Sequence, residues 1–227
     1  MDRILTQWEQ AAEAYWQTQM QSEDARRNWE TVEARFSDLS GAEVLDVGCG
    51  YGVYTDYFCQ IGARAVGCDG SPAMLERAAT LYPNCTFDLV DLLDPLPYDS
   101  GRFDLVFCNQ VLMDLPAVDG LFREFTRILK EKGTLYIGIV HPAAYPGDWI
   151  EDGNGVKTGK RVRDYAKNYQ IEHRFCGGTT HFHRPISIYL NFAAENGFRF
   201  VHMDEPDQGD AGMPLFLYAE FQKQTAG

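Results

Sequence analysis

The chain has 227 residues, of which 45% are hydrophobic, and its formal net charge is −13 at pH 7. A chain of this length fits one domain with a small elaboration, and its acidic charge argues against nucleic-acid substrates, which favour a basic protein surface. No apolar run is long enough to span a membrane and residues 1–10 do not resemble a signal peptide, so we expect a cytoplasmic protein without a membrane partner.

The first 40 residues are predicted to form a helical cap. Apolar side chains recur there at spacings of three and four, which gives one apolar helix face. This face consists of Trp8, Ala11, Ala12, Tyr15 and Trp16. A second apolar stripe begins at Trp29, and neither glycine nor proline interrupts residues 2–38.

The next element is an apolar strand, Val44–Val47, which leads into glycines 48, 50 and 52 and then a predicted helix over 53–61. Glycine lets the chain turn at little steric cost and lets a ligand approach the backbone, while the helix start offers unpaired N–H groups. A dinucleotide-binding turn is similar, but its last glycine comes three residues after the second, where this chain has Val53. Asp46 would also face a pyrophosphate unfavourably, whereas it suits an ammonium or a sulfonium.

Strands and helices alternate from here to residue 140, which predicts a parallel sheet with helices on both faces. Further strands are predicted over 65–69, 103–109 and 133–137, and helices over 73–81 and 117–129. The second strand ends in Asp69, 23 residues after Asp46, and Val90-Asp91-Leu92 precedes a loop that contains two prolines.

Residues 141–185 are too long for a passive connection in a compact domain, and we interpret them as a lid or a small added hairpin. The basic residues between Lys157 and Lys167 form either a solvated hairpin face or a patch for an anionic substrate or partner. A helix over 185–196 and strands over 198–204 and 214–222 are predicted to complete the chain.

These motifs, in this order over residues 42–141, resemble those of class I S-adenosylmethionine-dependent methyltransferases, above all the small-molecule group that includes ubiquinone-biosynthesis-type enzymes. The resemblance implies an α/β, Rossmann-like fold with a mostly parallel seven-stranded sheet whose last two strands form an antiparallel edge hairpin. We therefore expect an N-terminal helical cap over 1–40 and a methyltransferase domain over 41–227, with the lid insert at about 141–185.

The resemblance also implies roles in binding the cofactor. Asp69 would bind both ribose hydroxyls, and Asp91 the adenine amino group, although the first can instead cap a helix and the second can be a loop residue. Asp46 would orient the methionine end or cap the following helix, Met74 would pack on the adenine or belong to the core, and the N-terminal helix with Tyr15 would close over the site. The predicted cofactor-binding residues are Tyr15, Asp46, Gly48, Cys49, Gly50, Asp69, Gly70, Ser71, Met74, Asp91, Leu92, Asn109, Gln110 and Val111.

Methyl transfer needs little acid–base chemistry, because the sulfonium makes the methyl group electrophilic and alignment supplies much of the catalysis. A base is needed when the acceptor is a neutral hydroxyl or a protonated amine. The predicted catalytic or acceptor-contacting residues are His141, which follows the fifth strand, Tyr145 and His183. His181 shares a face with His183 in an extended chain, but no third ligand is near in sequence, so we expect no metal site.

We therefore expect S-adenosylmethionine-dependent methyl transfer to a small-molecule acceptor by in-line displacement, with S-adenosylhomocysteine as the product. The alternatives are a cofactor-binding regulatory or assembly protein without turnover, and a protein or RNA methyltransferase. No Asn-Pro-Pro-Tyr segment follows the fourth strand, where Asn109-Gln110-Val111-Leu112 stands, which disfavours methylation of exocyclic amino groups. The six cysteines contain no C-x-x-C pair, so we expect reduced thiols.

Overall fold

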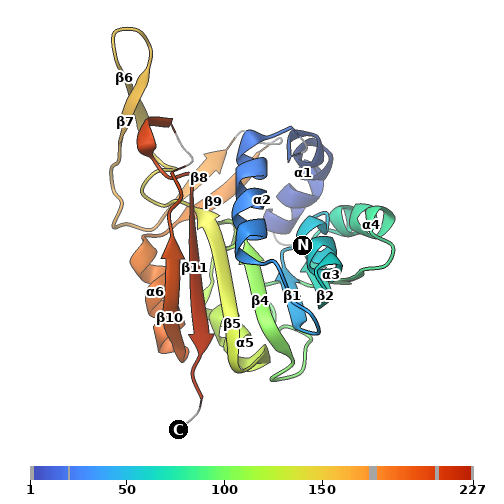
Figure 1. Ribbon diagram of the computed structural model, residues 1–227. Coiled ribbons are helices and arrows are strands. Elements are labelled where there is room, and N and C mark those ends of the chain that lie inside the picture. Colours follow the sequence, from blue (N-terminus) through green and yellow to red (C-terminus); the bar gives the residue numbers. More distant parts are fainter. Residues whose placement is uncertain (1–2, 20, 174–177, 208–209, 226–227) are drawn as a thin grey trace.

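A seven-stranded sheet with the strand order β10-β11-β5-β4-β1-β2-β3 forms the centre of the molecule (Figure 1). The computed structural model describes residues 3–19, 21–173, 178–207 and 210–225. The strands are β1 (Glu43–Val47), β2 (Arg64–Asp69), β3 (Thr86–Leu89), β4 (Phe103–Asn109), β5 (Leu129–Val140), β10 (Phe198–Asp204) and β11 (Phe216–Lys223). Strands β1 to β5 pair in parallel, whereas β11 is antiparallel to both β5 and β10, so the predicted sheet and its edge hairpin are confirmed.

Helices cover both faces of this sheet, as predicted. They are α1 (Arg3–Gln19), α2 (Glu23–Arg35), α3 (Val53–Gln60), α4 (Pro72–Leu81), α5 (Asp119–Ile128) and α6 (Ile186–Glu195), with short 3-10 turns η1 (Leu112–Asp114) and η3 (Asp210–Gly212). Buried side chains of α5 and α6 pack in one core cluster, and those of α2 and α3 pack in another. The predicted helical region over 2–38 is divided because the Ser22 side chain caps α2 by accepting the Ala25 N–H at 3.2 Å.

The insert after β5 consists of two hairpins. Strands β6 (Asp148–Glu151) and β7 (Lys157–Arg161) form one that projects from the body, and β8 (Tyr169–His173) and β9 (Thr179–His183) form the other (Figure 1). Strand β9 contacts both α1 and η1, so the second hairpin lies near the carboxyl ends of the central strands. In the projecting hairpin, the ammonium groups of Lys157 and Lys160 each lie 4.6 Å from the Trp149 ring centroid.

Among the described residues, no helix has the length and apolar character needed to cross a membrane. Cys176 lies outside the described residues, and the other five cysteines are free thiols.

Candidate active site

The glycine turn between β1 and α3 is closely packed on both sides. Gly48 has a φ of +67°, and a Cβ atom there would lie 2.4 Å from a methyl group of Val111, the residue that follows β4 by two positions. Gly52 has a φ of +76° at the start of α3, and its Cβ would lie 2.5 Å from the Phe87 ring of β3. Only glycine fits this combination of left-handed backbone and close neighbours, so the turn is held between the ends of β3 and β4.

Asp69, at the end of β2, ties the second strand to the glycine turn. One carboxylate oxygen accepts the Gly50 N–H and the other accepts the Ser71 N–H, both at 2.9 Å. Each carboxylate oxygen has a second lone pair, and the residue is partly exposed, so it can still accept hydroxyl groups of a ligand. Burial raises the pKa of this carboxyl, and the nearby charge of Glu9 raises it further.

Asp46 lies beneath the turn rather than beside it. Its side chain is only 2% exposed and accepts a hydrogen bond of 2.7 Å from the Thr55 hydroxyl, in the first turn of α3. Burial raises the pKa of Asp46 to about 7, while the Thr55 hydroxyl opposes this rise. This hydrogen bond fixes the Asp46 side chain to the first turn of α3, whose N-cap is Gly52, and both a capping role and a role toward the cofactor stay predictions.

The acidic residues near the carboxyl ends of β1, β2 and β4 interact electrostatically. The Asp69 charge contributes to the raised pKa of both Asp46 and Asp114. These carboxyls therefore lie close enough to repel one another when they are ionised, and burial favours their protonated forms. A ligand with positive charge would offset this repulsion, because each carboxyl is more readily ionised when that charge is present.

Helix α1 packs directly over the turn. The Tyr51 hydroxyl donates to the Ala12 carbonyl oxygen, and Tyr15 stacks on the Tyr51 ring at a centroid distance of 5.9 Å. The Glu9 carboxylate accepts the Ser71 hydroxyl at 2.5 Å and also the Ala73 N–H at 3.1 Å, so α1 is fixed to the start of α4.

Several predicted cofactor residues meet beneath this helix. A Cβ atom on Gly70 would lie 2.3 Å from a Leu5 methyl group, and Met74, only 3% exposed, packs in the cluster with Tyr51. Ser71 accepts the Met74 N–H at 3.3 Å and is the N-cap of α4. The sequence-predicted residues Tyr15, Gly70, Ser71 and Met74 thus form one layer over the ends of β1 and β2.

The remaining predicted cofactor residues follow β3 and β4. The Asp91 side chain accepts the Leu93 N–H at 3.0 Å, and Leu92 is buried in the core. The Asn109 amide donates to the Asn28 Oδ1 of α2 at 3.3 Å. Gln110 has a φ of +60°, and its buried Nε2 has no hydrogen-bond partner within the described part of the chain. A strained residue with an unused buried donor beside the glycine turn fits a ligand-binding position.

Two predicted catalytic histidines are held by structural hydrogen bonds. The His141 Nδ1 accepts the N–H groups of Ala143 and Ala144 at 3.1 and 3.2 Å, and its Nε2 donates to Glu205 at 2.8 Å. The His183 Nε2 donates to the Tyr165 carbonyl at 3.0 Å. Both ring nitrogens of His141 are occupied by these hydrogen bonds, so this geometry favours a structural role for His141.

A buried acid and histidine that the sequence interpretation did not pair lie beside the third candidate, Tyr145. Oδ1 of Asp114 in η1 is 3.1 Å from Nε2 of His181 in β9, and the two residues are 7% and 9% exposed. The Tyr145 ring lies 5.5 Å from the His181 ring, and burial together with the Asp114 charge raises the pKa of Tyr145 to about 12. In the sequence, Asp114 could have been recognised as an acidic residue within the apolar run from Val111 to Leu115.

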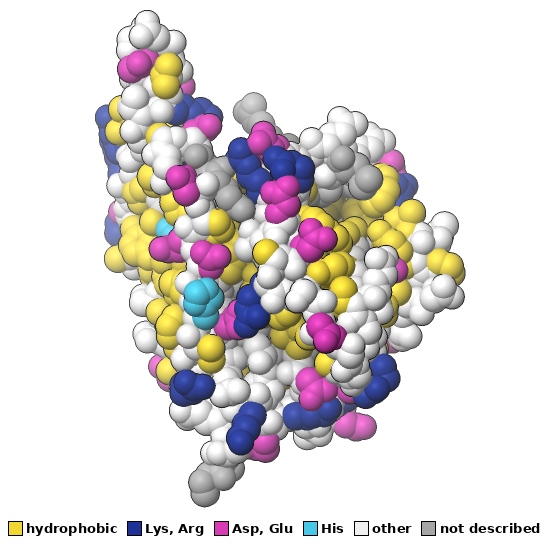
Figure 2. All heavy atoms as spheres, in the orientation of Figure 1, with side chains coloured by type: hydrophobic (Ala, Val, Ile, Leu, Met, Phe, Trp, Pro, Cys, Tyr) yellow, Lys and Arg dark blue, Asp and Glu magenta, His cyan; other side chains and the backbone are white. Residues whose placement is uncertain are grey.

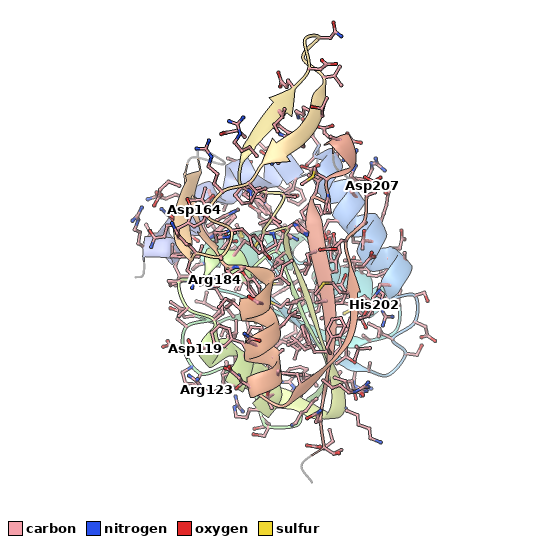
Figure 3. All side chains as sticks on the ribbon, turned by 90° about the vertical axis from the view of Figure 1, so that its left-hand side faces the viewer. Asp119, Arg123, Asp164, Arg184, His202 and Asp207 are labelled. Atoms are coloured by element: carbon pink, nitrogen blue, oxygen red, sulfur yellow. The ribbon has the colours of Figure 1, made fainter. Side chains whose placement is uncertain are left out.

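Arg184 fixes the turn that carries Asp114. This buried guanidinium, at the start of α6 in Figure 3, donates to the carbonyl oxygens of Leu112 at 3.1 Å and Leu115 at 2.5 Å. The hydrogen bonds span both ends of η1, so the position of the Asp114 carboxyl is set by the fold rather than by a mobile loop.

Comparison with known proteins finds methyltransferases that are similar to this chain. A family described as "Methyltransferase domain" matches residues 45–137. An uncharacterized methyltransferase of Synechocystis sp. is 36% identical over 112 residues, 48% of this chain and 51% of that protein. A ubiquinone biosynthesis O-methyltransferase of Xanthomonas oryzae pv. oryzae is 32% identical over 120 residues, 50% of this chain and 50% of that protein. The chain spans about half the length of the curated relatives it matches.

The fold is shared over a larger part of the chain. The crystal structure of an S-adenosylmethionine dependent methyltransferase from Mesorhizobium loti superposes with a TM-score of 0.74 at 25% identity, and covers 86% of this chain and 97% of that one. S-adenosylmethionine is the cofactor of this domain class. Residues 45–137 thus match the methyltransferase domain family, within a chain that has the class I, S-adenosylmethionine-dependent methyltransferase fold.

Proposed function

We propose that the protein transfers the methyl group of S-adenosylmethionine to a small-molecule acceptor. The observation that carries the proposal is Asp69, whose two carboxylate oxygens are anchored to Gly50 and Ser71 and still have free lone pairs at the edge of the glycine turn. The matching domain family, and the O-methyltransferase name of one relative, support both the chemistry and an acceptor of small size.

The residues present fit such a cofactor. The carboxyls of Asp46, Asp69 and Asp114 would be more readily ionised beside a sulfonium, and Asp69 would hold the ribose. Asp91 and Leu92 would contact the adenine, and the segment from Asn109 to Val111 would face the methionine part. When bound, the cofactor supplies an electrophilic methyl group on sulfur.

The acceptor would lie between α1, β9 and η1. Strand β9 contacts both other elements, and each part contributes a buried polar atom that lacks a hydrogen-bond partner in the described ranges. These atoms are Gln7 Oε1 of α1, Thr179 Oγ1 of β9 and Gln110 Nε2 just ahead of η1. Unused polar atoms on neighbouring elements fit a polar ligand that binds among them, and the covering elements would exclude water from the reaction.

The Asp114–His181 pair is placed to accept a proton from the acceptor. A neutral hydroxyl or a protonated amine must lose its proton to attack the methyl carbon, and histidine titrates close to neutral pH. Asp114 would orient the His181 ring, while Tyr145 packs against the ring. Alignment of the acceptor by these residues would supply most of the remaining rate enhancement for in-line displacement.

Formation of S-adenosylhomocysteine in the presence of fractionated small metabolites tests this function. The full chain is incubated with methyl-labelled S-adenosylmethionine, and label should appear in a low-molecular-weight product in an acceptor-dependent way. Asp69→Asn is the matched control, because it removes the charge and preserves the side-chain size. Label that appears only in protein or RNA fractions would overturn a small-molecule acceptor. S-adenosylhomocysteine binding without any transfer would instead favour a regulatory protein.

A further inference from the structure

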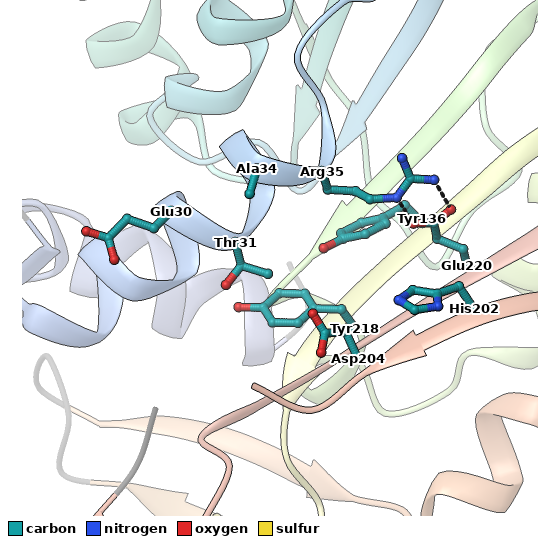
Figure 4. A pocket seen from close by; sticks show the side chains of 9 residues that line it. All are labelled: Glu30, Thr31, Ala34, Arg35, Tyr136, His202, Asp204, Tyr218 and Glu220. Carbon is teal, nitrogen blue, oxygen red and sulfur yellow. Dashed lines mark hydrogen bonds and ion pairs between the residues drawn. The ribbon is translucent and has the colours of Figure 1, made fainter. Parts of the chain in front are cut away.

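A hollow that takes no part in the proposed reaction lies on the opposite face of the sheet from η1. It is a groove of about 390 Å³ between α2 and the strands β5, β10 and β11, drawn in close-up in Figure 4. Its tyrosines belong to the core cluster packed against α2 and α3, whereas Leu112 and Met113 of η1 belong to the cluster packed against α5 and α6. A volume of this size suits a small organic ligand.

The floor of the groove contains an unused hydroxyl. Tyr136 is only 2% exposed, yet its hydroxyl makes no hydrogen bond with any residue in the described ranges. Figure 4 shows this hydroxyl pointing along the groove towards α2. The residue is buried but lines the groove, so a ligand in the groove can make the hydrogen bond that the described residues leave unused. The neighbouring Tyr218 ring lies 6.0 Å away between centroids and adds a second aromatic surface.

The charge available in the groove is negative. The Arg35 guanidinium is held by both carboxylate oxygens of Glu220, so this cation is already neutralised. Asp204 is exposed, makes no ion pair within the described residues, and contributes to the raised pKa of both Tyr136 and Tyr218. Its carboxylate therefore lies near both phenols. In Figure 2, acidic side chains lie beside hydrophobic surface on this face of the molecule.

We propose that this groove binds a small organic ammonium ion. The nitrogen would pair with the Asp204 carboxylate, donate to the Tyr136 hydroxyl and lie against the Tyr218 ring, which combines an ion pair, a hydrogen bond and a cation–π contact. An anion of the same size is disfavoured by Asp204 and by the net charge of −13.

The groove is connected to the edge of the sheet where the cofactor residues lie. The Tyr218 hydroxyl donates to Asn28 Oδ1 at 2.8 Å, and the Asn109 amide donates to the same oxygen at 3.3 Å. A ligand that contacts Tyr218 therefore acts on the atom that also holds Asn109. Ammonium binding is expected to change cofactor affinity, and the cofactor to change ammonium affinity by the same factor. This coupling rests on the proposed function, whereas ammonium binding alone does not.

Titration of the full chain with n-butylammonium, in the absence of cofactor and at constant ionic strength, tests the site. Saturable binding is expected for this cation and not for butyrate or butanol. Asp204→Asn should weaken it about fivefold, the scale of one partly exposed ion pair. Asp207→Asn is the matched control, because Asp207 is exposed and lies beyond the end of β10, away from His202 (Figure 3). Equal binding of cation and anion, or equal loss in both variants, would overturn the proposal.

Tyr136→Phe separates a binding role from a structural one. The hydroxyl has no hydrogen-bond partner among the residues that the structure describes, so its removal should weaken butylammonium binding without lowering the thermal midpoint. A lower midpoint with unchanged affinity would show that the hydroxyl serves the fold and would reject the site. A further titration, of S-adenosylhomocysteine with and without butylammonium, addresses only the coupling. An unchanged cofactor affinity there removes the coupling and leaves the ammonium site in place.

Discussion

Asp46 and Thr55 share a buried hydrogen bond of 2.7 Å beneath the glycine turn, and the burial of this carboxyl makes stability depend on pH. Burial raises the pKa of Asp46 to about 7, whereas an aspartate in an unfolded chain titrates near ~3.9. The folded state therefore holds the proton more tightly, and the free energy of unfolding falls as pH rises from ~4 to ~7. Asp69 and Asp114 also have raised pKa values, so their contributions have the same sign.

Asp46→Asn should remove most of this pH dependence. The amide stays neutral and its oxygen can still accept the Thr55 hydroxyl, so the variant should resist urea better than the parent at pH 8, on the order of 1–3 kcal/mol. The difference should shrink as pH falls and vanish below about pH 4, where Asp46 is protonated in both the folded and the unfolded state. Exposed Asp94→Asn is the control and should leave the pH profile unchanged. A parent protein that becomes more stable between pH 5 and pH 8 would contradict the assignment.

Asp69→Asn should weaken S-adenosylhomocysteine binding at least roughly tenfold, since charge-assisted hydrogen bonds contribute ~1.5–3 kcal/mol each and 1.4 kcal/mol is a factor of ten. The substitution keeps an oxygen for one of the backbone N–H groups of Gly50 and Ser71, so the turn is less disturbed than in Asp69→Ala. Calorimetry at pH 8 measures the change. The prediction fails if a folded variant binds with parental affinity.

Much of the fold could be predicted from sequence because its signals are local. The apolar run before the glycines, the spacing of Asp69 behind Asp46 and the alternation of helices and strands each depend on neighbouring residues. The order of the sheet then follows from the right-handed connections between parallel strands and places their carboxyl ends at one edge.

The acceptor side could not be predicted in the same way, because its contacts join distant segments. Asp114 and His181 meet only when β9 packs on η1, and neither residue has a local motif. The sequence interpretation favoured His141 because it follows β5, but local N–H groups and Glu205 occupy its ring. The groove at Tyr136 depends on how α2 lies across β5 and β11, which no residue spacing encodes.

The three histidines should differ in their effect on turnover. Asp114→Asn and His181→Gln should lower kcat about 100-fold or more, the lower end for loss of a general base, with S-adenosylhomocysteine affinity retained within roughly twofold. His141→Gln and His183→Gln should each cost less than roughly tenfold, because their rings hydrogen-bond to Glu205 and Tyr165. Circular dichroism checks that each variant is folded. Equal losses in all three histidine variants would contradict a special role for the Asp114–His181 pair.

Glu9→Gln should loosen α1 over the cofactor edge. Its carboxylate accepts the Ser71 hydroxyl at 2.5 Å and the Ala73 N–H at 3.1 Å at the start of α4, where a negative charge is also favoured by the helix dipole. The amide retains the size and loses the charge, so hydrogen exchange should accelerate over residues 3–19 and S-adenosylhomocysteine should dissociate faster. Glu13→Gln is the control within the same helix, because Glu13 pairs with Arg77 at the surface rather than with the backbone of α4. If α1 closes over the bound cofactor, only the Glu9 variant changes the dissociation rate of S-adenosylhomocysteine. If both variants behave like the parent, α1 is a fixed part of the domain and closure must come from the β8–β9 hairpin alone.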